Sequence, residues 1–538
     1  MTDSVAPDPP ASPMAWDAWG DPVRTTPLSD HLRELLAQAF GVDPTPEPPV
    51  REEDVRLRAS TLRAADRDAL AAIVGAGAVS TADAVRLRHA GGKSTLDLLR
   101  RRLPEQEAPD AVVEPASHDD VLAVLRLCAE RRIAVVSFGG GTSVVGGVDP
   151  VRDGFRAVIA LDLRRLSAVT DVDARSGTAT LGAGLTGPRA EALLAEHGVC
   201  IGHFPQSFEF ATIGGFAATR SSGQSSAGYG RFDDMVQGLT VATPRGTLSL
   251  GRGPASAAGP DLRAMFLGSE GVLGVITDVT LRVHATPAHT VHGAWSFPDF
   301  AAGADAVRTL VQRGGSPTVL RLSDEAETAV NLAVADSIGS SAPTPGCLAI
   351  ATFDGTPERA QRSAETAREI LESTGATWCG AAPAEGWERG RFDAPYLRDA
   401  LLRVGVLTET LETATTWSNL LPLRAAVSEA LTASLAGQGT PPLVLCHLSH
   451  TYRTGASLYF TVACKQTDDP IGQWSAAKRD ACDAIVRTGG TISHHHAVGR
   501  DHRPWMRDEI GDLGVDVLRA VKATLDPAGV LNPGKLIP

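Results

Sequence analysis

Four histidines lie close together near the C-terminal end, in the segment TISHHHAVGRDH at residues 491–502. Imidazole side chains grouped in this way could bind a metal ion, or they could move protons and hold phosphate oxygens near neutral pH. The remnant of a purification tag normally stands at a terminus, so the position of the run inside the chain argues against that origin. The segment is therefore a candidate for the chemistry of this protein.

The local structure expected for this segment bears on the choice between a metal and proton transfer. If GGTISHHHAVG enters as a strand after Gly489 and Gly490, neighbouring side chains point to opposite faces. His494 and His496 would then share one side while His495 faces away. Three adjacent imidazoles could not easily close on one ion, although two could do so with a distant residue. We therefore predict proton transfer and phosphate binding here, and no metal.

A glycine-rich loop could hold a phosphate group. The apolar segment IAVVSF at residues 133–138 predicts a buried strand, and the loop SFGGGTSVVGG at 137–147 follows it directly. The glycines at 139–141 let the backbone come close to a ligand and turn several N–H groups inward. Thr142 and Ser143 add hydroxyl groups to the same loop. The pattern predicts a nest for a pyrophosphate.

Two other glycine motifs match nucleotide-binding signatures only formally. GGKST at residues 91–95 looks like the end of a P-loop, but the pattern needs a glycine where Leu87 stands, and no strand precedes it. GAGLTG at 182–187 matches G-x-G-x-x-G, yet the next strand does not end in an acid that could hold a ribose. We interpret the second motif as a tight strand-to-helix turn, with a dinucleotide site as the alternative.

The composition is that of a globular protein with two or three domains. The chain has 538 residues and a formal net charge of −13 without a long basic run, which argues against a nucleic-acid partner. Seven cysteines lie far apart without a C-x-x-C pair, so a reducing compartment is expected. No secretory signal, membrane-spanning run or S-K-L ending is recognisable, so we expect a cytoplasmic protein.

The texture of the sequence changes along the chain and predicts four parts. Residues 1–105 begin Pro-rich and become helical from about 52 to 102, and residues 106–286 alternate short strands with helices. Residues 287–490 mix strands with long helices, and residues 491–538 carry the histidines, a helix and a turn-rich strap.

Several elements are predicted with defined limits. ASHDDVLAVLRLCAERR is expected to form a helix that Ser117 caps, with acidic residues in its first turn. AVIALDL, AVTDV and GTATLGA predict strands, and PERAQRSAETAREILESTG predicts a long helix.

Together these segments resemble the FAD-binding domain of the vanillyl-alcohol oxidase type of flavoprotein, and within that superfamily the chain is most similar to the alkyldihydroxyacetonephosphate synthases. The resemblance spans nearly the whole chain and rests on GGGTS, FEFATIGGFAATRSSG, YGRFDDMV, TPRG, GSEGVLGVIT, YLRDALL, LYFTV, SHHHAVG and LDPAGVLNPGKL. LYFTV together with SHHHAVG marks the synthase-like branch. The family fold is α+β, with a two-subdomain PCMH-type FAD-binding domain, an α+β cap domain for the substrate, and a helical N-terminal region.

The resemblance also implies roles for individual residues. Tyr459 and the run His494, His495 and His496 match the catalytic residues of the family, and Arg398 and Arg321 match arginines of the substrate site. The residues that would hold FAD are Ser137, Phe138, Gly139, Gly140, Gly141, Thr142, Ser143, Gln206, Ser207, Phe208, Glu209, Phe210, Ala211, Thr212, Thr219, Arg220, Ser221, Ser222, Glu270, Gly271, Val272, Leu273, Gly274, Val275 and Ile276.

Local patterns alone would explain three of these residues differently. Arg398 beside Asp399 could be an ion pair on a helix surface, Tyr459 a core residue, and Arg321 an ordinary strand position. Only the matched motifs assign them to a site.

The function implied by the resemblance is exchange of the acyl group of acyl-dihydroxyacetone phosphate for a fatty alcohol, in ether-lipid synthesis. The alternative is an FAD-dependent 2-hydroxy-acid dehydrogenase or oxidase on the same scaffold. His447 and Arg453 stand where other residues are expected in the animal synthases, which leaves room for a different substrate.

The resemblance also suggests how the cofactor is held and which partners the protein has. The glycine-rich loop holds no histidine or cysteine, so we expect FAD to be bound without a covalent bond. Family members suggest a homodimer with peripheral contact to a membrane surface.

Overall fold

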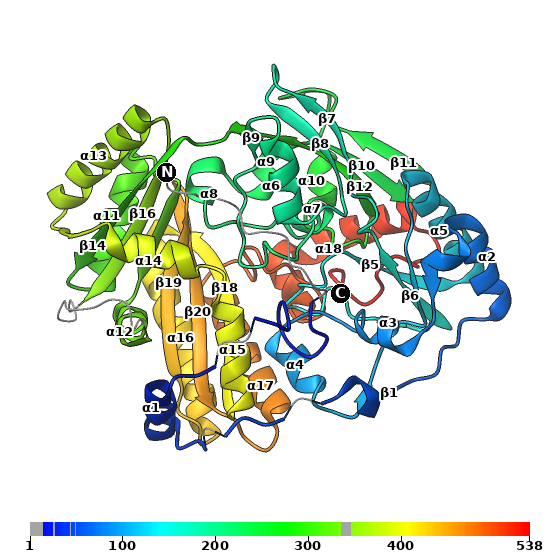
Figure 1. The fold of residues 1–538 in the computed structure, drawn as a ribbon, viewed down its shortest axis with the longest axis horizontal. Helices are drawn as coiled ribbons and strands as arrows, with labels where there is room; N and C mark the ends of the chain where they lie inside the picture. The colour runs from blue at the N-terminus through cyan, green and yellow to red at the C-terminus, as the bar shows by residue number, and fades with distance from the viewer. Residues whose placement is uncertain (1–13, 25–26, 44, 49, 335–345) are drawn as a thin grey trace.

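The computed structural model describes residues 14–24, 27–43, 45–48, 50–334 and 346–538. Within these residues three larger β-sheets and the helices that cover them form an α+β fold, as predicted (Figure 1). Among the same residues, no helix is both long and apolar enough to cross a membrane.

A four-stranded sheet leads into the predicted phosphate-binding loop. Its order is β2-β4-β6-β5, and β4, β6 and β5 run parallel, so that the loop follows the carboxyl end of a buried strand. Helix α5 begins where expected because Ser117 Oγ accepts a hydrogen bond from Asp120 N at 3.1 Å. The strands are β2 (Val79–Ser80), β4 (Ala111–Val113), β5 (Ile133–Phe138) and β6 (Ala157–Asp162), covered by α2 (Ala64–Val74) and α5 (His118–Arg131).

The region expected to be helical from 52 to 102 is broken into short pieces. Gly75 ends α2 in a left-handed conformation with φ 90°, and Gly91 has φ 154°, so glycines interrupt the helical pattern. The pieces besides α2 are η1 (Glu52–Asp54), η2 (Ala76–Ala78), α3 (Asp83–Leu87) and α4 (Thr95–Arg100).

A second, antiparallel sheet has the order β11-β10-β12-β8-β7. The GAGLTG motif joins the end of β8 to the start of α6 and forms the tight turn that we expected. The strands are β7 (Val169–Asp173), β8 (Thr178–Gly182), β10 (Val236–Thr243), β11 (Gly246–Leu250) and β12 (Val275–Arg282), and the helices packed with them include α6 (Gly187–Ala195) and α7 (Ile213–Thr219).

The third sheet is antiparallel, with the order β17-β14-β16-β15-β19-β20-β18, and lies on the left of Figure 1. Its core side chains pack against long helices on the same part of the chain. Its strands are β14 (His289–Phe297), β15 (Val319–Ser323), β16 (Cys347–Gly355), β17 (Thr377–Gly380), β18 (Val406–Thr416), β19 (Leu443–Thr451) and β20 (Gly455–Lys465). The helices are α11 (Phe300–Arg313), α12 (Glu325–Val334), α13 (Pro357–Ser373), α14 (Ala382–Gly390), α15 (Ala394–Arg403), α16 (Leu420–Gly437) and α17 (Pro470–Arg487).

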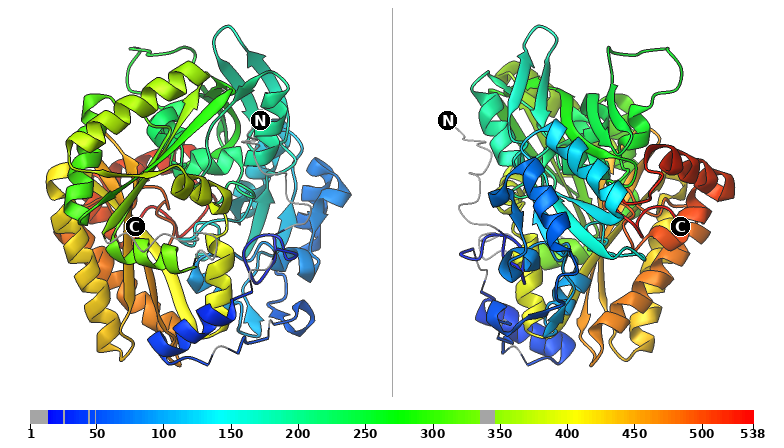
Figure 2. Two further views of the ribbon diagram at one scale, coloured as in Figure 1. Left: turned by 60° about the vertical axis from the view of Figure 1, so that its left-hand side comes forward. Right: turned by 90° about the vertical axis from the view of Figure 1, so that its right-hand side faces the viewer.

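The C-terminal segment returns to the first sheet. Helix α18 (Met506–Leu525) lies at the surface beside α17 in the right-hand view of Figure 2. After it, Val135 N donates to Val530 O and Asn532 N donates to Val135 O, each at 2.8 Å. The strap therefore extends the sheet along β5, next to the glycine-rich loop.

Candidate active site

The histidine run is not a strand, and the expectation that it would be one is wrong. Residues 491–499 form a series of bends around one carboxylate from the middle of β18. Glu412 accepts hydrogen bonds from the backbone N–H groups of His494, His495 and His496, at 2.7, 3.1 and 2.9 Å, and from Ser493 Oγ at 2.9 Å. In a strand, these backbone N–H groups would bond to a neighbouring strand. Here they bond to the Glu412 carboxylate instead.

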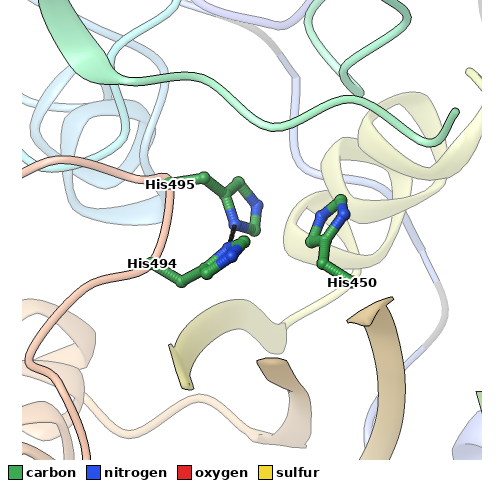
Figure 3. A group of neighbouring side chains, drawn as sticks. All are labelled: His450, His494 and His495. Atoms are coloured by element: carbon green, nitrogen blue, oxygen red, sulfur yellow. Dashed lines mark hydrogen bonds between the residues drawn. The ribbon is translucent and has the colours of Figure 1, made fainter. Parts of the chain in front are cut away.

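This conformation brings His494 and His495 together with a third histidine, His450 on β19 (Figure 3). The Nδ1 atoms of His494 and His495 lie 2.9 Å apart. The His450 ring stacks on His494 with a centroid distance of 5.0 Å and meets His495 edge-on at 5.1 Å. Sequence reasoning missed His450, because nothing in its own segment marks it as part of this group.

The electrostatics of the group are dominated by burial. Burial lowers the pKa of His494 and His495 and lowers the pKa of His496 to about 3, although the nearby Glu412 acts in the opposite direction. For Glu412, burial raises the pKa, but the surrounding imidazoles and N–H donors lower it more, to well below its ordinary value. At neutral pH the site therefore holds an ionised carboxylate and neutral imidazoles, which can accept protons.

Tyr459 lies in the centre of the same site. On β20 it is paired with Glu412 of β18 on one side and with His447 of β19 on the other. Its ring stacks on His447 at 4.8 Å between centroids and lies 6.0 Å from His495, and its hydroxyl donates to Thr410 Oγ1 at 3.0 Å. Burial raises the pKa of Tyr459 to about 12. The hydroxyl is neutral at pH 7, and the ring lies next to His447, His495 and His496.

Arg321 on β15 reaches the edge of this site. Its Nη2 donates to Glu327 Oε1 at 2.6 Å and lies 2.9 Å from His447 Nδ1. Burial raises the pKa of Glu327, but Arg321 and His447 lower it to about 2, so the carboxylate stays ionised. Arg321 is thus not an ordinary strand position, although much of its charge is already paired within the protein.

Arg398 on α15 is held in a buried network. Its Nη1 donates to Lys93 O at 2.7 Å and its Nε donates to Asp399 Oδ1 at 2.9 Å. The two side chains are only 11% and 12% exposed, so the ion pair is internal and not on a helix surface. Arg398 Nη2 is buried and has no well-aligned hydrogen-bond partner among the described residues. It nevertheless lies 2.9 Å from Asp399 Oδ1, so the guanidinium is already paired with that carboxylate.

The glycine-rich loop after β5 is packed closely against the second predicted cofactor segment. A Cβ atom at Gly139 would overlap Thr212 Oγ1, and one at Gly140 would overlap the carbonyl of Phe210. Gly141 has φ 68°, the left-handed region that favours glycine. Only glycine fits this close approach of two backbones, so the motif builds a narrow cradle.

Buried polar groups around this cradle lack protein partners among the described residues. They include Ser137 Oγ, Gln206 Nε2 and Asn532 Oδ1. Buried polar atoms rarely stay unpaired, so these three atoms are expected to form hydrogen bonds with a polar cofactor. The chemistry of this cradle fits the phosphates and polar ring edges of FAD.

Glu270 connects the cradle to the histidine run. Its carboxylate accepts from Val498 N at 3.0 Å and from Gly499 N at 2.9 Å, just after the histidines. Asn532 Nδ2 donates to Glu270 O at 2.6 Å and to Gly147 O at 3.0 Å. The glycine-rich loop, the 268–276 loop and the C-terminal segment are thereby held as one unit.

Two kinds of side chain stand out among the other predicted cofactor residues. Phe208, Val272 and Leu273 are buried in apolar surroundings, so their side chains stabilise the loops rather than bind through polar atoms. Arg220 pairs with Asp233 at 2.7 Å and is 55% exposed, and Glu209 pairs with Arg24 of the N-terminal segment. These side chains are already engaged, so these residues would contact a cofactor through their backbones.

A metal is the other chemistry that three imidazoles permit. One nitrogen from each of His450, His494 and His495 lies within 4.8 Å of the others. However, His494 already uses both of its nitrogens, with His495 Nδ1 and Tyr452 Oη, and His450 Nδ1 lies 3.2 Å from Ser222 Oγ.

We therefore expect treatment with EDTA, followed by removal of the chelator, to leave turnover unchanged. Elemental analysis of the purified protein checks this. A stoichiometric transition metal whose removal abolishes turnover would contradict the expectation.

Acid should destabilise the fold through His203. Burial, with help from His495 and Arg231, lowers the pKa of His203 to about 3. The unfolded side chain titrates near pH ~6.5, so the unfolded state binds more protons below that pH and this contribution to stability is lost as the pH falls from about 6.5 to 3. Glu191 and Glu270, whose pKa burial raises to about 7, act with the opposite sign.

The contribution of His203 is isolated by comparing wild type with His203→Asn in urea denaturation between pH 7 and 4.5. We expect the free energy of unfolding of the variant to fall less steeply with acid. Parallel curves would rule out this role for His203.

The comparisons with known proteins agree with this arrangement. A family model described as "FAD binding domain" matches residues 109–250, and one described as "FAD linked oxidases, C-terminal domain" matches residues 286–536. The first contains the glycine-rich loop, and the second contains the predicted catalytic and substrate residues.

Similar proteins also come from curated sequences and solved structures. An alkyldihydroxyacetonephosphate synthase of Dictyostelium discoideum is 36% identical over 473 residues, covering 84% of this chain and 77% of the relative. A solved alkyldihydroxyacetonephosphate synthase structure superposes with a TM-score of 0.84 at 31% identity, covering 97% of this chain and 99% of that chain. A probable mitochondrial D-lactate dehydrogenase of Danio rerio is 28% identical over 475 residues, covering 86% of this chain and 90% of the relative.

Sequence, fold and site therefore agree: the chain belongs to the FAD-linked oxidases, with FAD as its cofactor, and within them to the alkyldihydroxyacetonephosphate synthase family.

Proposed function

We propose that this protein is an FAD-dependent alkyldihydroxyacetonephosphate synthase. It exchanges the fatty acyl group of acyl-dihydroxyacetone phosphate for a fatty alcohol, in the synthesis of ether lipids. The observation that carries the proposal is the convergence of Tyr459 with the histidine run, in which His495 lies 6.0 Å from the tyrosine ring and both lie next to the ionised Glu412. A hydroxyl among neutral imidazoles suits proton transfer at a substrate carbon and its leaving group.

The phosphate of the substrate would be held by arginine. Both candidate arginines are already paired within the protein, Arg398 with Asp399 at 2.9 Å and Arg321 with Glu327 at 2.6 Å. We assign the phosphate chiefly to Arg398, which matches the substrate-binding arginine of the family, since a planar guanidinium pairs well with phosphate oxygens. Arg321 then orients His447 at the edge of the site.

FAD supplies the bond-making chemistry when it is bound. We propose that it is held without a covalent bond by the residues predicted from the sequence, in the loops at 137–143, 206–212, 219–222 and 270–276. The unpaired Ser137 Oγ and the glycine cradle support this placement. The proposed domain limits are 1–105, 106–286, 287–490 and 491–538.

We also propose a homodimer in the cytoplasm that contacts the inner face of a membrane peripherally, where its lipid substrates would be found. Light scattering and co-sedimentation with phospholipid vesicles test these two points. A monomer that stays in the supernatant would refute both.

The experiment that tests the function supplies labelled fatty alcohol and palmitoyl-dihydroxyacetone phosphate to the purified yellow protein. Label in an ether-linked product supports the synthase. No incorporation by protein that retains its flavin would overturn it.

The alternative function is a 2-hydroxy-acid dehydrogenase, which the similarity to a probable D-lactate dehydrogenase favours. In that case a D-2-hydroxy acid should bleach the flavin absorbance in the absence of oxygen, and Arg398 would hold the carboxylate of the substrate. An unchanged flavin spectrum would exclude this alternative.

A further inference from the structure

The proposed reaction leaves a proton that the active site has to export. The bond between C1 and the acyl oxygen breaks with its electron pair on the departing fatty acid, and a bond forms between C1 and the alcohol oxygen. The fatty acid is ionised at neutral pH, so it does not carry away the proton of the alcohol. This inference rests on the proposed function, and it concerns the path by which that proton reaches solvent.

The groups that would first accept the proton have little contact with water. His450 is 5% exposed and His494 is 7% exposed, and the side chain of His495 is 15% exposed. A proton left on a buried imidazole would block the next turnover, because burial disfavours the charged ring. The group therefore needs a connection to the surface.

One continuous chain of hydrogen bonds leads outward. His495 Nδ1 and His494 Nδ1 are 2.9 Å apart, and His494 Nε2 is 2.6 Å from Tyr452 Oη. Tyr452, which directly follows β19, is only partly buried, and the next residue along the chain, Arg453, is exposed. The two nitrogens of His494 are thus bonded to different groups, one to His495 and one to the partly buried Tyr452.

A second branch of the network ends inside the protein. His450 Nδ1 lies 3.2 Å from Ser222 Oγ, and Ser222 donates its own proton to Ser226 Oγ. Ser222 must then accept from His450, which fixes Nδ1 of His450 as the protonated nitrogen. Ser222 and Ser226 are 3% and 9% exposed, so this branch fixes a tautomer but leads to no solvent.

We propose that Tyr452 is the exit relay for the proton, receiving it from His494 and releasing it at the surface. A hydroxyl can accept one proton while it donates another, so Tyr452 needs no lasting charge to do so. Tyr452 acts through His494 and does not touch the substrate, so it is a positioning and relay residue rather than a catalytic one.

The electrostatics of Tyr452 agree with that role. Burial raises its pKa to about 12, while Arg231 and the Ser222 hydroxyl act in the opposite direction. The phenol therefore stays neutral at pH 7. The guanidinium of Arg231 disfavours a second positive charge beside it, which drives a proton that reaches Tyr452 onward to water.

The test is Tyr452→Phe, which keeps the ring and removes only the hydroxyl. We expect turnover with labelled fatty alcohol to fall about 100-fold, the low end of what a positioned proton-transfer group contributes. Flavin content and KM should stay as in wild type. Release of protons, followed with an indicator dye in weak buffer, should slow in parallel, and added imidazole buffer should restore part of the rate.

The matched control is Tyr229→Phe. Tyr229 is also a partly buried tyrosine with a bonded hydroxyl, which donates to Asp354 Oδ2 at 3.1 Å away from the histidine group. Its loss should leave proton release unchanged and give no response to imidazole. Tyr452→His, which keeps a group able to pass protons, should be faster than Tyr452→Phe.

Two outcomes would overturn the relay. One is a Tyr452→Phe variant with wild-type turnover, and the other is a slow variant that no buffer rescues and that Tyr452→His does not improve. If Tyr452→Phe does not fold, the test rests on Tyr452→His alone. We expect normal proton release from that variant, and loss of proton release would contradict the relay. Failure of wild type to incorporate label would instead refute the proposed function.

Discussion

Tyr459→Phe is expected to keep its FAD and its fold but to lose turnover by about 10²- to 10⁴-fold, as expected for a group that transfers a proton in the rate-limiting step. The Tyr459 hydroxyl donates to Thr410 Oγ1, and the Tyr459 ring lies 6.0 Å from the His495 ring. The phenylalanine ring would still stack on His447, so packing should change little. Turnover with labelled alcohol and the flavin absorbance spectrum measure the two effects separately.

The control for this variant is again Tyr229→Phe, which loses a hydrogen-bonded hydroxyl outside the site. We expect the control to keep near-normal turnover. A Tyr459→Phe variant as active as that control would remove Tyr459 from the chemistry, whatever the substrate proves to be.

The second large effect is expected from Glu412→Gln. Glu412 Oε1 accepts from Ser493 Oγ, His495 N and His496 N, and Oε2 accepts from His494 N. An amide keeps one acceptor oxygen, but its NH2 group must face an N–H donor. The lost hydrogen bond should cost about 1–3 kcal/mol of unfolding free energy.

The effect on catalysis should be larger than the effect on stability. Without both acceptors the histidine run cannot keep its bends, and the neutral side chain no longer stabilises protonated imidazole. We expect turnover to fall at least about 100-fold, because small displacements of catalytic groups are costly. Denaturation curves and the turnover assay are the measurements.

Glu191→Gln is the matched control for Glu412→Gln. Glu191 is also a buried glutamate that accepts backbone N–H groups, from Ile201 at 3.1 Å and Gly202 at 2.9 Å. Because burial raises the pKa of Glu191 to about 7, this variant should lose less stability than Glu412→Gln, and it should keep its turnover. Equal effects of the two variants on turnover would mean that Glu412 is only structural.

Much of the cofactor-binding half could be predicted from the sequence. The strand at 133–138, the helix capped by Ser117 and the turn at 182–187 all depend on contacts within a few residues. The close turn at glycines 139–141 could likewise be predicted, because glycine alone has no Cβ atom to restrict its backbone. The motif match then added the candidate residues Tyr459 and Arg398, which no local pattern distinguishes from a core tyrosine or an ion pair.

The arrangement of the histidines was decided only by the tertiary structure. The alternation of side chains along a strand predicted that His495 would face away from His494. That prediction failed because the backbone N–H groups of the run bond to Glu412, which is 82 positions away from His494. His450 at the end of β19 and Tyr452 just after it join the group only through the fold, which brings them against His494. Local sequence determined which residues have the right chemistry. Long-range hydrogen bonds decided which of them meet, because a buried carboxylate outweighs the local preference of the segment around it.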